Sequence, residues 1–301
     1  MIPVRRKGEG AMYLDAFRLP GEGWEGRFLA DNPETKRTCY GSYYPFGLFP
    51  PRQLSEVSCA PVTILYGGNG SGKSTLLSLM AQVLGVERGA PFNRSAFFDD
   101  FAAACRWKGA GAPKGSRLIA SDDVFDFVLD LRSLNDGVER RRGELLEEYA
   151  KRRRTPYQLR SLEDLEELRR NNAAKSGTGS RFVKREGMVD TPERSNGESA
   201  LLYFTEHIKE NALYLLDEPE NSMAVGFQLQ LRQFLADSVR FFGCQLVIAT
   251  HSPFLLSLPG ARVYDLDSRP AAVRPWTELE NMRAYYQFFK EHRAAFEGAE
   301  S

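Results

Sequence analysis

The sequence predicts an α/β fold with a mostly parallel central sheet. Three short apolar runs, at 62–66, 212–216 and 244–249, have the length and composition of strands buried on both faces. Apolar residues recur at helical spacing after the first run and after the second, so helices are expected between the strands. Because strands that alternate with helices pair in parallel, one sheet is expected to contain all three runs.

Composition limits the classes of function. The 301 residues are 42% hydrophobic and 27% charged, as in a folded chain, and forty basic residues balance forty acidic ones, so a chain that binds polyanions over its whole surface is not expected. Cys39, Cys59, Cys105 and Cys244 form no CxxC pair, which argues against a zinc site and a disulfide framework. No apolar run approaches the ~20 residues of a membrane span, and the N-terminus lacks the apolar core of a secretion signal. We therefore expect a cytoplasmic protein with no membrane partner.

The sharpest motif is a glycine-rich loop directly after the first apolar run. It comprises Gly67, Gly68, Asn69, Gly70, Ser71, Gly72, Lys73, Ser74 and Thr75, and it satisfies GxxxxGK[ST]. A strand precedes it and an apolar helical repeat follows it, which is the order that a phosphate-binding loop requires. Lys73 is expected to meet the β- and γ-phosphates, and Ser74 to ligate Mg²⁺. The loop predicts binding of a nucleoside triphosphate; the alternative is a turn that only joins two elements.

Two carboxylates, Asp217 and Glu218, end the second apolar run. At the carboxyl edge of a parallel sheet Asp217 can hold Mg²⁺, directly or through water, and Glu218 can polarise the water that attacks the γ-phosphate. An acidic loop without chemistry is the alternative. His251 follows the third run, where it can contact the γ-phosphate or serve only a structural role.

The order of these segments resembles the ATP-binding-cassette (ABC) ATPases. The strings Asp217-Glu218-Pro219-Glu220-Asn221 and Ala249-Thr250-His251-Ser252-Pro253 are similar to the soluble, non-transporter branch, which includes chromosome-maintenance, recombination-repair and AAA-domain ATPases. The resemblance implies a P-loop NTPase of the ABC type that hydrolyses ATP with Mg²⁺. In that case Lys73, Glu218 and His251 are catalytic, and Ser74 and Asp217 bind the metal.

The resemblance also implies a head-to-tail dimer, in which a signature sequence reaches the γ-phosphate of the partner subunit. The matching stretch is Arg194–Ser199, where Ser195, Gly197 and Glu198 are the expected nucleotide contacts. Ser195 can also cap the helix that follows, and the two roles can coexist. The segment between the phosphate loop and this stretch suits a helical lobe, inserted at about 122–195 into a single domain that spans 1–301.

The sequence departs from the transporter pattern at two loops. A strand is expected at Arg117–Ala120, but Ser121, Asp122 and Asp123 stand where a metal-sensing glutamine belongs. They can ligate Mg²⁺ or its water, or cap a helix. The stretch Ser222–Val225 lacks the aspartate through which transporters communicate across the dimer, which puts coupling between two sites in doubt.

No residue is assigned to the adenine base. Tyr40, Tyr43, Tyr44 and Phe46 are aromatic candidates for stacking on it, or they belong to core or turn packing.

The lobe carries the one regional excess of positive charge. Residues 139–185 contain fourteen Lys and Arg against eight Asp and Glu, so the lobe can meet nucleic-acid phosphates or form a solvated helix face. Helices are expected at 123–134 and 139–154, with a further helix opened by a Ser161–Asp164 capping box and a terminal helix at 278–296.

The resulting hypothesis is a Mg²⁺-dependent ATPase that acts through an ATP-dependent homodimer. The alternative is a nucleotide-gated switch, with little turnover of its own, that controls a partner effector in DNA repair or defence. A transporter motor is disfavoured by the missing glutamine and by the Ser195–Ser199 variant of the signature.

Overall fold

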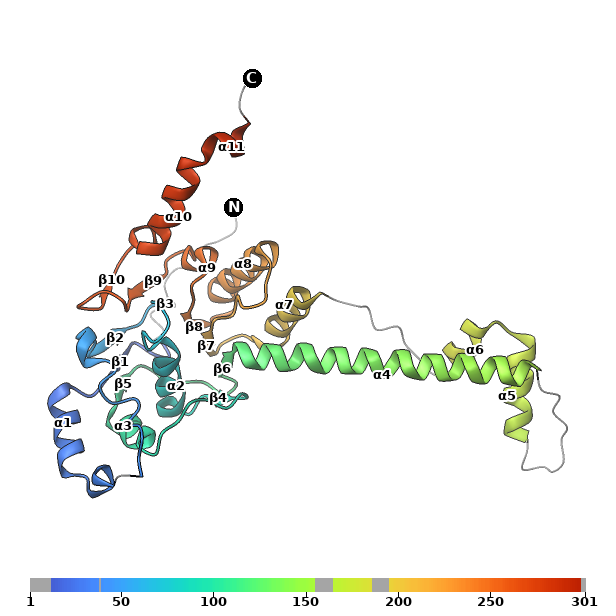
Figure 1. Ribbon diagram of the computed structural model, residues 1–301, viewed down its shortest axis with the longest axis horizontal. Coiled ribbons are helices and arrows are strands. Elements are labelled where there is room, and N and C mark those ends of the chain that lie inside the picture. Colours follow the sequence, from blue (N-terminus) through green and yellow to red (C-terminus); the bar gives the residue numbers. More distant parts are fainter. Residues whose placement is uncertain (1–11, 38, 155–164, 186–194, 299–301) are drawn as a thin grey trace. The chain divides into compact units, whose positions relative to one another are not determined.

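The computed structural model describes residues 12–37, 39–154, 165–185 and 195–298 (Figure 1). The chain forms two compact units. One comprises the residues up to Val124 together with those from Ala200 onward, and the other is Phe125–Ser199. Both sheets belong to the first unit, and the described part of the second is helical.

A seven-stranded sheet forms the centre of the first unit. In spatial order its strands are β10 (Ala272–Val273), β9 (Arg262–Asp265), β3 (Val62–Tyr66), β8 (Gln245–Ala249), β7 (Leu213–Asp217), β6 (Arg117–Ala120) and β4 (Glu87–Arg88). All neighbours pair in parallel except β10, which runs antiparallel to β9. The predicted α/β fold with a mostly parallel sheet is thereby confirmed.

The register of the central strands brings distant segments to one edge. Leu65 of β3 and Asp217 of β7 both pair with Ala249 of β8, and Ala120 of β6 pairs with Asp217. Because parallel strands end on the same side, the residues that follow these four positions are neighbours along one edge of the sheet.

Seven helices lie wholly within the described residues of the first unit. They are α1 (Glu22–Asp31), α2 (Lys73–Leu84), α3 (Phe98–Ala104), α8 (Val225–Phe241), α9 (Pro253–Leu256), α10 (Glu280–Glu291) and α11 (Arg293–Glu297), with short 3₁₀ turns at Pro33–Lys36, Pro50–Arg52 and Trp276–Glu278. Helix α2 packs against β6, β7 and β8. Its Leu77 and Met80 share one buried cluster with Leu215 and Val247 of the strands, and burial of this kind is the main favourable term in folding.

A second sheet stands beside the first. It is antiparallel and three-stranded, in the order β2 (Glu56–Ser58), β1 (Ala16–Arg18) and β5 (Arg106–Lys108). The backbone N–H of Leu14, shortly before β1, donates to the buried side chain of Gln245 at 2.9 Å.

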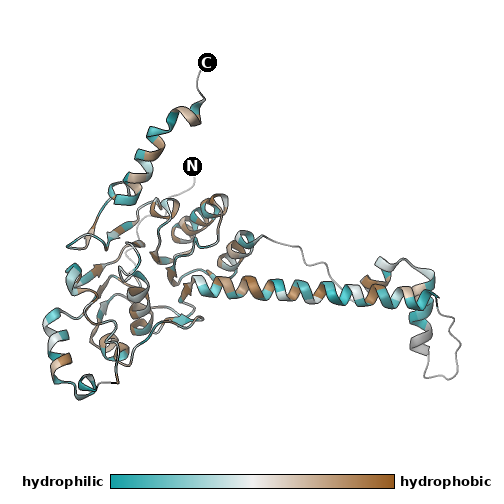
Figure 2. Ribbon diagram, in the orientation of Figure 1, coloured by the Kyte–Doolittle hydropathy of each residue, from teal (hydrophilic) through white to brown (hydrophobic). Residues whose placement is uncertain are grey.

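The second unit is built on a single long helix. Helix α4 (Ser121–Arg154) is continuous, so the expected break between helices at 123–134 and 139–154 is wrong. Gly137, inside the expected break, lies in the helix with open space around it, and helical hydrogen bonding outweighs the roughly 1 kcal/mol that an internal glycine costs. The helix is about 50 Å long, and it carries alternating hydrophilic and hydrophobic bands (Figure 2).

Two short helices pack on the C-terminal part of α4. They are α5 (Leu165–Ser176) and α6 (Gly179–Arg185), and their Ala174 and Phe182 form a small cluster with Leu145. The Tyr149 hydroxyl donates to the Gly177 carbonyl at 3.0 Å. The expected Ser161–Asp164 capping box lies outside the described residues. The last helix of the unit, α7 (Asn196–His207), starts there and continues into the first unit.

The end of the chain forms two helices where one was expected. Helices α10 and α11 meet at His292, whose backbone is non-helical (φ −98°, ψ 14°). None of the helices in the described ranges combines the length and the hydropathy that a bilayer crossing requires.

Leu215→Ala tests the central packing. Leu215 is fully buried in the middle of β7, so its truncation is expected to lower the free energy of unfolding by about 2–5 kcal/mol. Chemical denaturation measures the change. Leu229→Ala on α8, where the side chain is 47% exposed, is the matched control and should cost less than about 1 kcal/mol. Equal losses in the two variants would contradict this packing.

Candidate nucleotide-binding site

The glycine-rich loop joins β3 to α2 in a backbone shape that only glycine tolerates at two positions. A Cβ on Gly67 (φ +156°) would lie 2.7 Å from the Ser71 hydroxyl, and a Cβ on Gly72 (φ +96°) would lie 3.1 Å from the Phe49 ring. The first contact is closer than real Cβ atoms come, and at both positions the positive φ would strain any other residue, which explains why these positions are glycine. The Ser71 hydroxyl is buried and has no hydrogen-bond partner among the described residues.

Lys73 opens α2 and is only 5% exposed. Its ammonium donates to the Gly67 carbonyl at 2.6 Å and to the Gly68 carbonyl at 3.3 Å, and it lies 2.9 Å from Nε2 of His251. Burial lowers the pKa of Lys73, and the nearby carboxylates of Glu218 and Asp217 partly oppose that shift. The ammonium therefore donates to two neutral carbonyl groups, which charged phosphate oxygens can replace.

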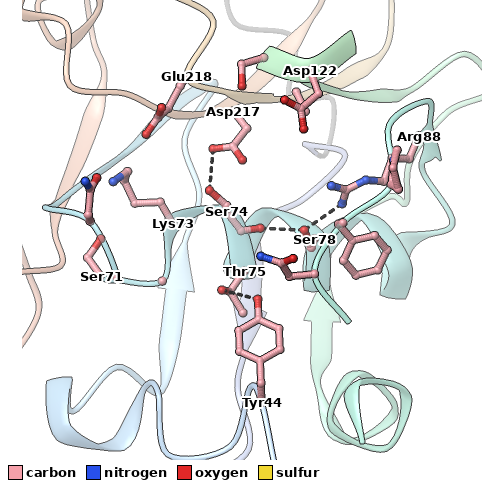
Figure 3. A pocket seen from close by; sticks show the side chains of 18 residues that line it. Tyr44, Ser71, Lys73, Ser74, Thr75, Ser78, Arg88, Asp122, Asp217 and Glu218 are labelled. Atoms are coloured by element: carbon pink, nitrogen blue, oxygen red, sulfur yellow. Dashed lines mark hydrogen bonds between the residues drawn. The ribbon is translucent and has the colours of Figure 1, made fainter. Parts of the chain in front are cut away.

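Ser74 and Asp217 meet where the phosphate loop faces the end of β7. The Ser74 hydroxyl donates to Oδ1 of Asp217 at 3.0 Å (Figure 3). Burial raises the pKa of Asp217, and the neighbouring charge of Glu218 adds to this effect, while the hydrogen bond from Ser74 lowers it. A hydroxyl and a carboxylate side by side are the oxygen ligands that Mg²⁺ binds beside a phosphate.

Glu218 and His251 stand opposite each other at the same edge. Oε1 of Glu218 lies 3.6 Å from Nε2 of His251, and both side chains are about one-third exposed. The backbone N–H of Glu218 donates to the Ala249 carbonyl at 2.9 Å. Glu218 adopts a left-handed backbone (φ 48°), a strained conformation that proteins hold mainly at functional sites.

Glu220 fixes the segment that carries His251. Its Oε1 accepts hydrogen bonds from the Thr250 hydroxyl at 2.6 Å, the His251 N–H at 2.8 Å and the Ser252 N–H at 3.0 Å. Sequence reasoning quoted Glu220 within a motif string but gave it no role. Its partners lie some thirty positions away along the chain, and no local spacing marks them.

Lys73, Ser74, Asp217 and Glu218 border one cavity of about 550 Å³, whereas His251 and Glu220 are not among the residues that line it. Its walls are Tyr44, Asn69, Gly70, Ser71, Gly72, Lys73, Ser74, Thr75, Ser78, Arg88, Pro91, Phe92, Asn93, Ala120, Ser121, Asp122, Asp217 and Glu218 (Figure 3). The cavity therefore brings together the phosphate loop, the acidic pair and the end of β6.

Arg88 and Phe92 of this cavity were missed by the sequence analysis. The Arg88 guanidinium donates to the Ser78 hydroxyl at 2.8 Å and lies 4.2 Å from the centre of the Phe92 ring. Arg88 belongs to a two-residue edge strand, which is too short to give a sequence signal. Its guanidinium adds a second positive charge to the wall.

One of the four aromatic candidates borders the cavity. The hydroxyl of Tyr44 lies 2.6 Å from that of Thr75, with Tyr44 in the cavity wall. Tyr40 and Tyr43 pack against Phe97, and Phe46 stacks on Trp24. Those three rings therefore belong to packing, and Tyr44 remains the candidate for contact with the base.

Of the three residues at the expected glutamine position, one caps a helix and two line the cavity. Oδ2 of Asp123 accepts the Ala120 N–H at 2.8 Å, which is the bond of a helix cap. Ser121 and Asp122 instead line the cavity beside Asp217.

The signature residues lie in the unit Phe125–Ser199. Ser195 accepts the Glu198 N–H at its hydroxyl, 3.3 Å away, and the Ser199 N–H at its carbonyl, 2.9 Å away, so it caps α7. Gly197 is buried and Glu198 is exposed, whereas Arg194 lies outside the described residues.

Several arginines of the basic lobe have partners on their own helix. Arg141 pairs with Glu144, Arg142 with Glu139, and Arg152 with Glu148. Pairs three or four residues apart are typical of a solvated helix face.

The fold and the loop define a P-loop α/β protein. No protein-family model matches the chain. No curated protein matches it either. Among solved structures, a metal-chelate type ABC transporter in an inward-facing conformation is 18% identical, with 78% of this chain and 81% of that chain covered at a TM-score of 0.36.

Two further similar structures are heads of Smc proteins. One, from Pyrococcus furiosus, has an extended coiled coil and is bound to the C-terminal domain of ScpA; it is 13% identical, with 79% of this chain and 95% of that chain covered at a TM-score of 0.38. The other, from Thermotoga maritima, is 11% identical, with 88% of this chain and 99% of that chain covered at a TM-score of 0.37. The strand order and the glycine-rich loop of this chain define its fold.

Glu220→Ala tests the bracing of the His251 segment. The variant removes the acceptor shared by three donors, of which the Ser252 N–H keeps a second acceptor in the Thr250 hydroxyl at 3.0 Å. The free energy of unfolding should therefore fall by about 2–4 kcal/mol. Glu220→Gln keeps an accepting oxygen and should lose less than half as much. Thermal or chemical denaturation measures the stability of both variants. If Glu220→Gln loses as much stability as Glu220→Ala, the bracing role of Glu220 is contradicted.

Proposed function

We propose that the protein binds Mg·ATP in the cavity beside the phosphate loop and hydrolyses it. One observation carries this proposal: Lys73 lies 2.9 Å from His251, and Ser74 lies 3.0 Å from Asp217, at the ends of strands that are far apart in sequence. The phosphate loop and the acidic pair line one cavity, and His251 contacts the lysine of the loop. A glycine-rich turn without function would not require these partners.

The residues fit a triphosphate. Among the described residues, nothing accepts a hydrogen bond from the backbone N–H of Asn69, Gly70 or Gly72. The first N–H groups of α2 also lack partners within the helix, as at any helix start, and they add a positive dipole end. The buried Ser71 hydroxyl, which lacks a partner, supplies one further donor. Free donors around a glycine loop are what a phosphate group binds.

The chemistry follows from the position of each group. Glu218 holds and polarises the attacking water, and His251 contacts the γ-phosphate. Lys73 offsets charge on the β- and γ-phosphates. When bound, Mg²⁺ at Ser74 and Asp217 would neutralise charge on the phosphate oxygens. Tyr44, beside Thr75, and Arg88, hydrogen-bonded to Ser78, line the same cavity, and they would face the remainder of the nucleotide.

A head-to-tail homodimer completes the proposed site. Ser195, Gly197 and Glu198 at the start of α7 would contact the nucleotide held by a second subunit, and the helix N-terminus would add its dipole. The segment at about 122–195 would then be the helical lobe of one ATPase domain. Since phosphoryl transfer relies on positioning, a single subunit should be almost inactive.

Lys73→Ala tests the phosphate loop. Losing the ammonium should weaken ATP binding by at least tenfold, because a charge-assisted contact to the phosphates disappears. Isothermal titration with Mg·ATP measures the affinity. Lys36→Ala, at an exposed lysine of the same unit, is the control and should bind as the wild type does. Unchanged affinity in Lys73→Ala would remove the assignment of the loop.

Glu218→Gln tests the catalytic water and the dimer together. The amide cannot act as a base, so turnover should fall by a factor of about 10²–10⁴, while ATP binding persists. Light scattering after size exclusion should then reveal an ATP-dependent dimer that the wild type populates less. A monomer in saturating ATP would count against the dimer, and undiminished turnover would count against Glu218.

A nucleotide-gated switch is the second candidate, favoured by the C-terminal helices. Helices α10 and α11 expose five aromatic side chains by more than half: Tyr285, Tyr286, Phe288, Phe289 and Phe296. Exposed aromatic patches of this kind mark protein contacts, and a switch needs an effector protein to contact. Turnover measured with and without DNA, and with and without the product of a neighbouring gene, separates the two. A switch binds ATP with little hydrolysis under every condition.

A further inference from the structure

Two charged side chains hold the phosphate loop from outside the cavity. They are Arg52, from the 3₁₀ turn Pro50–Arg52, and Asp267, directly after β9. Neither borders the cavity, and neither belongs to the motifs of the sequence analysis. Each makes its contact through the loop backbone, 18 and 199 positions away along the chain.

Arg52 connects three segments through carbonyl oxygens. Its guanidinium donates to the Leu48 carbonyl at 2.8 Å, the Leu266 carbonyl at 3.1 Å and the Gly70 carbonyl at 3.0 Å. Its own carbonyl accepts the Ala271 N–H at 2.8 Å. The planar fork of an arginine can reach three acceptors at fixed angles, whereas a lysine ammonium cannot reproduce that geometry.

Asp267 holds the other side of the loop. Its Oδ2 accepts the Gly68 N–H at 2.6 Å. The aspartate is itself fixed, because Oδ1 of Asp265 accepts the backbone N–H groups of Asp267 at 3.1 Å and of Ser268 at 3.3 Å. The residue before Asp267 is Leu266, whose carbonyl binds Arg52. The two contacts therefore converge on one turn at 265–268.

The two contacts direct the polar groups of the loop. The carbonyl of Gly70 is bound by Arg52, and those of Gly67 and Gly68 are bound by Lys73. Carbonyl oxygens turned toward an anion would repel it. Among the described residues, the N–H groups of Asn69, Gly70 and Gly72 stay unbonded. A loop with four glycines loses much conformational entropy when it is ordered, so groups that fix it beforehand reduce the cost of binding.

We infer that Arg52 and Asp267 are positioning residues that hold the phosphate loop in its anion-binding shape before nucleotide arrives. The inference rests on the proposed function, because it concerns the same cavity. It adds that the turn at 265–268 sets the affinity of this site. Since the effect is on ground-state binding, it acts on nucleotide affinity and KM more than on kcat.

The carboxylate of Asp267 could act on the nucleotide through its charge as well as through its hydrogen bond to the loop, and two neutral variants separate these effects. Its carboxylate is negative, and as a charge alone it would repel a triphosphate. Asp267→Asn removes the charge but keeps an oxygen that can accept the Gly68 N–H. Asp267→Ala removes both. A positioning role and a purely electrostatic one therefore predict opposite results for Asp267→Ala.

The experiment measures the Kd of Mg·ATP by isothermal titration on the full chain, with the melting temperature as a check of folding. If Asp267 positions the loop, Asp267→Ala weakens ATP binding about tenfold, which corresponds to ~1.4 kcal/mol. Asp267→Asn stays within about twofold of the wild type or binds more tightly. In a steady-state assay KM rises in Asp267→Ala, while kcat changes by less than about twofold.

Arg52→Lys is a second variant. It tests the positioning role independently, including the case in which Asp267→Ala does not fold. It keeps the positive charge, so it should weaken binding about fivefold only if the fork geometry matters. Arg18→Ala, at an exposed arginine paired with Glu56 in the smaller sheet, is the control and should bind as the wild type does.

The outcomes separate the two proposals. If the wild type binds ATP and Asp267→Ala binds it equally well or more tightly, the positioning role of Asp267 is overturned, while the proposed function stands. Unchanged binding in Arg52→Lys overturns the role of Arg52. Wild type without affinity for Mg·ATP overturns the proposed function, and this inference with it.

Discussion

The buried ammonium of Lys73 is the interaction on which the site depends. A charge that is 5% exposed needs acceptors on every side, because removing it from water without them is costly. Lys73 finds them in the Gly67 and Gly68 carbonyls and in His251. Two of these belong to the loop after β3 and one to the segment after β8. The ammonium thereby fixes the loop and the histidine to each other, which parallel pairing of the two strands alone would not do.

Sequence patterns identified the parts of the site that the fold repeats locally. The apolar runs at 62–66, 212–216 and 244–249 predicted three buried strands of one sheet, and the strand Arg117–Ala120 is observed with the bounds expected for it. Since side chains just after parallel strands share one edge, the proximity of Lys73, Asp217 and His251 followed from those patterns. Such a deduction needs only the length and composition of each run.

The parts that were not predicted depend on contacts between distant residues. Glu220, Arg52 and Asp267 act on backbone N–H and C=O groups, which every residue has, so no residue type at the far end identifies the partner. The expectation of two helices, at 123–134 and 139–154, is wrong for a different reason, because α4 continues through Gly137. Its propensity cost of about 1 kcal/mol is small beside the hydrogen bonds of a 34-residue helix.

The charges around the cavity also explain why its anionic ligand should arrive with a metal ion. Two positive side chains, Lys73 and Arg88, face three carboxylates, those of Asp122, Asp217 and Glu218. The wall is therefore net negative when all five are ionised, although burial raises the pKa of Asp217 and lowers that of Lys73. A free triphosphate would be repelled by this excess, whereas a divalent cation between Asp217 and the phosphates reverses the sign of that contact. In the proposed function the loop supplies N–H groups for the phosphate, and the acidic pair holds the cation. The same carboxylates that would weaken binding of the bare nucleotide would then select its magnesium complex.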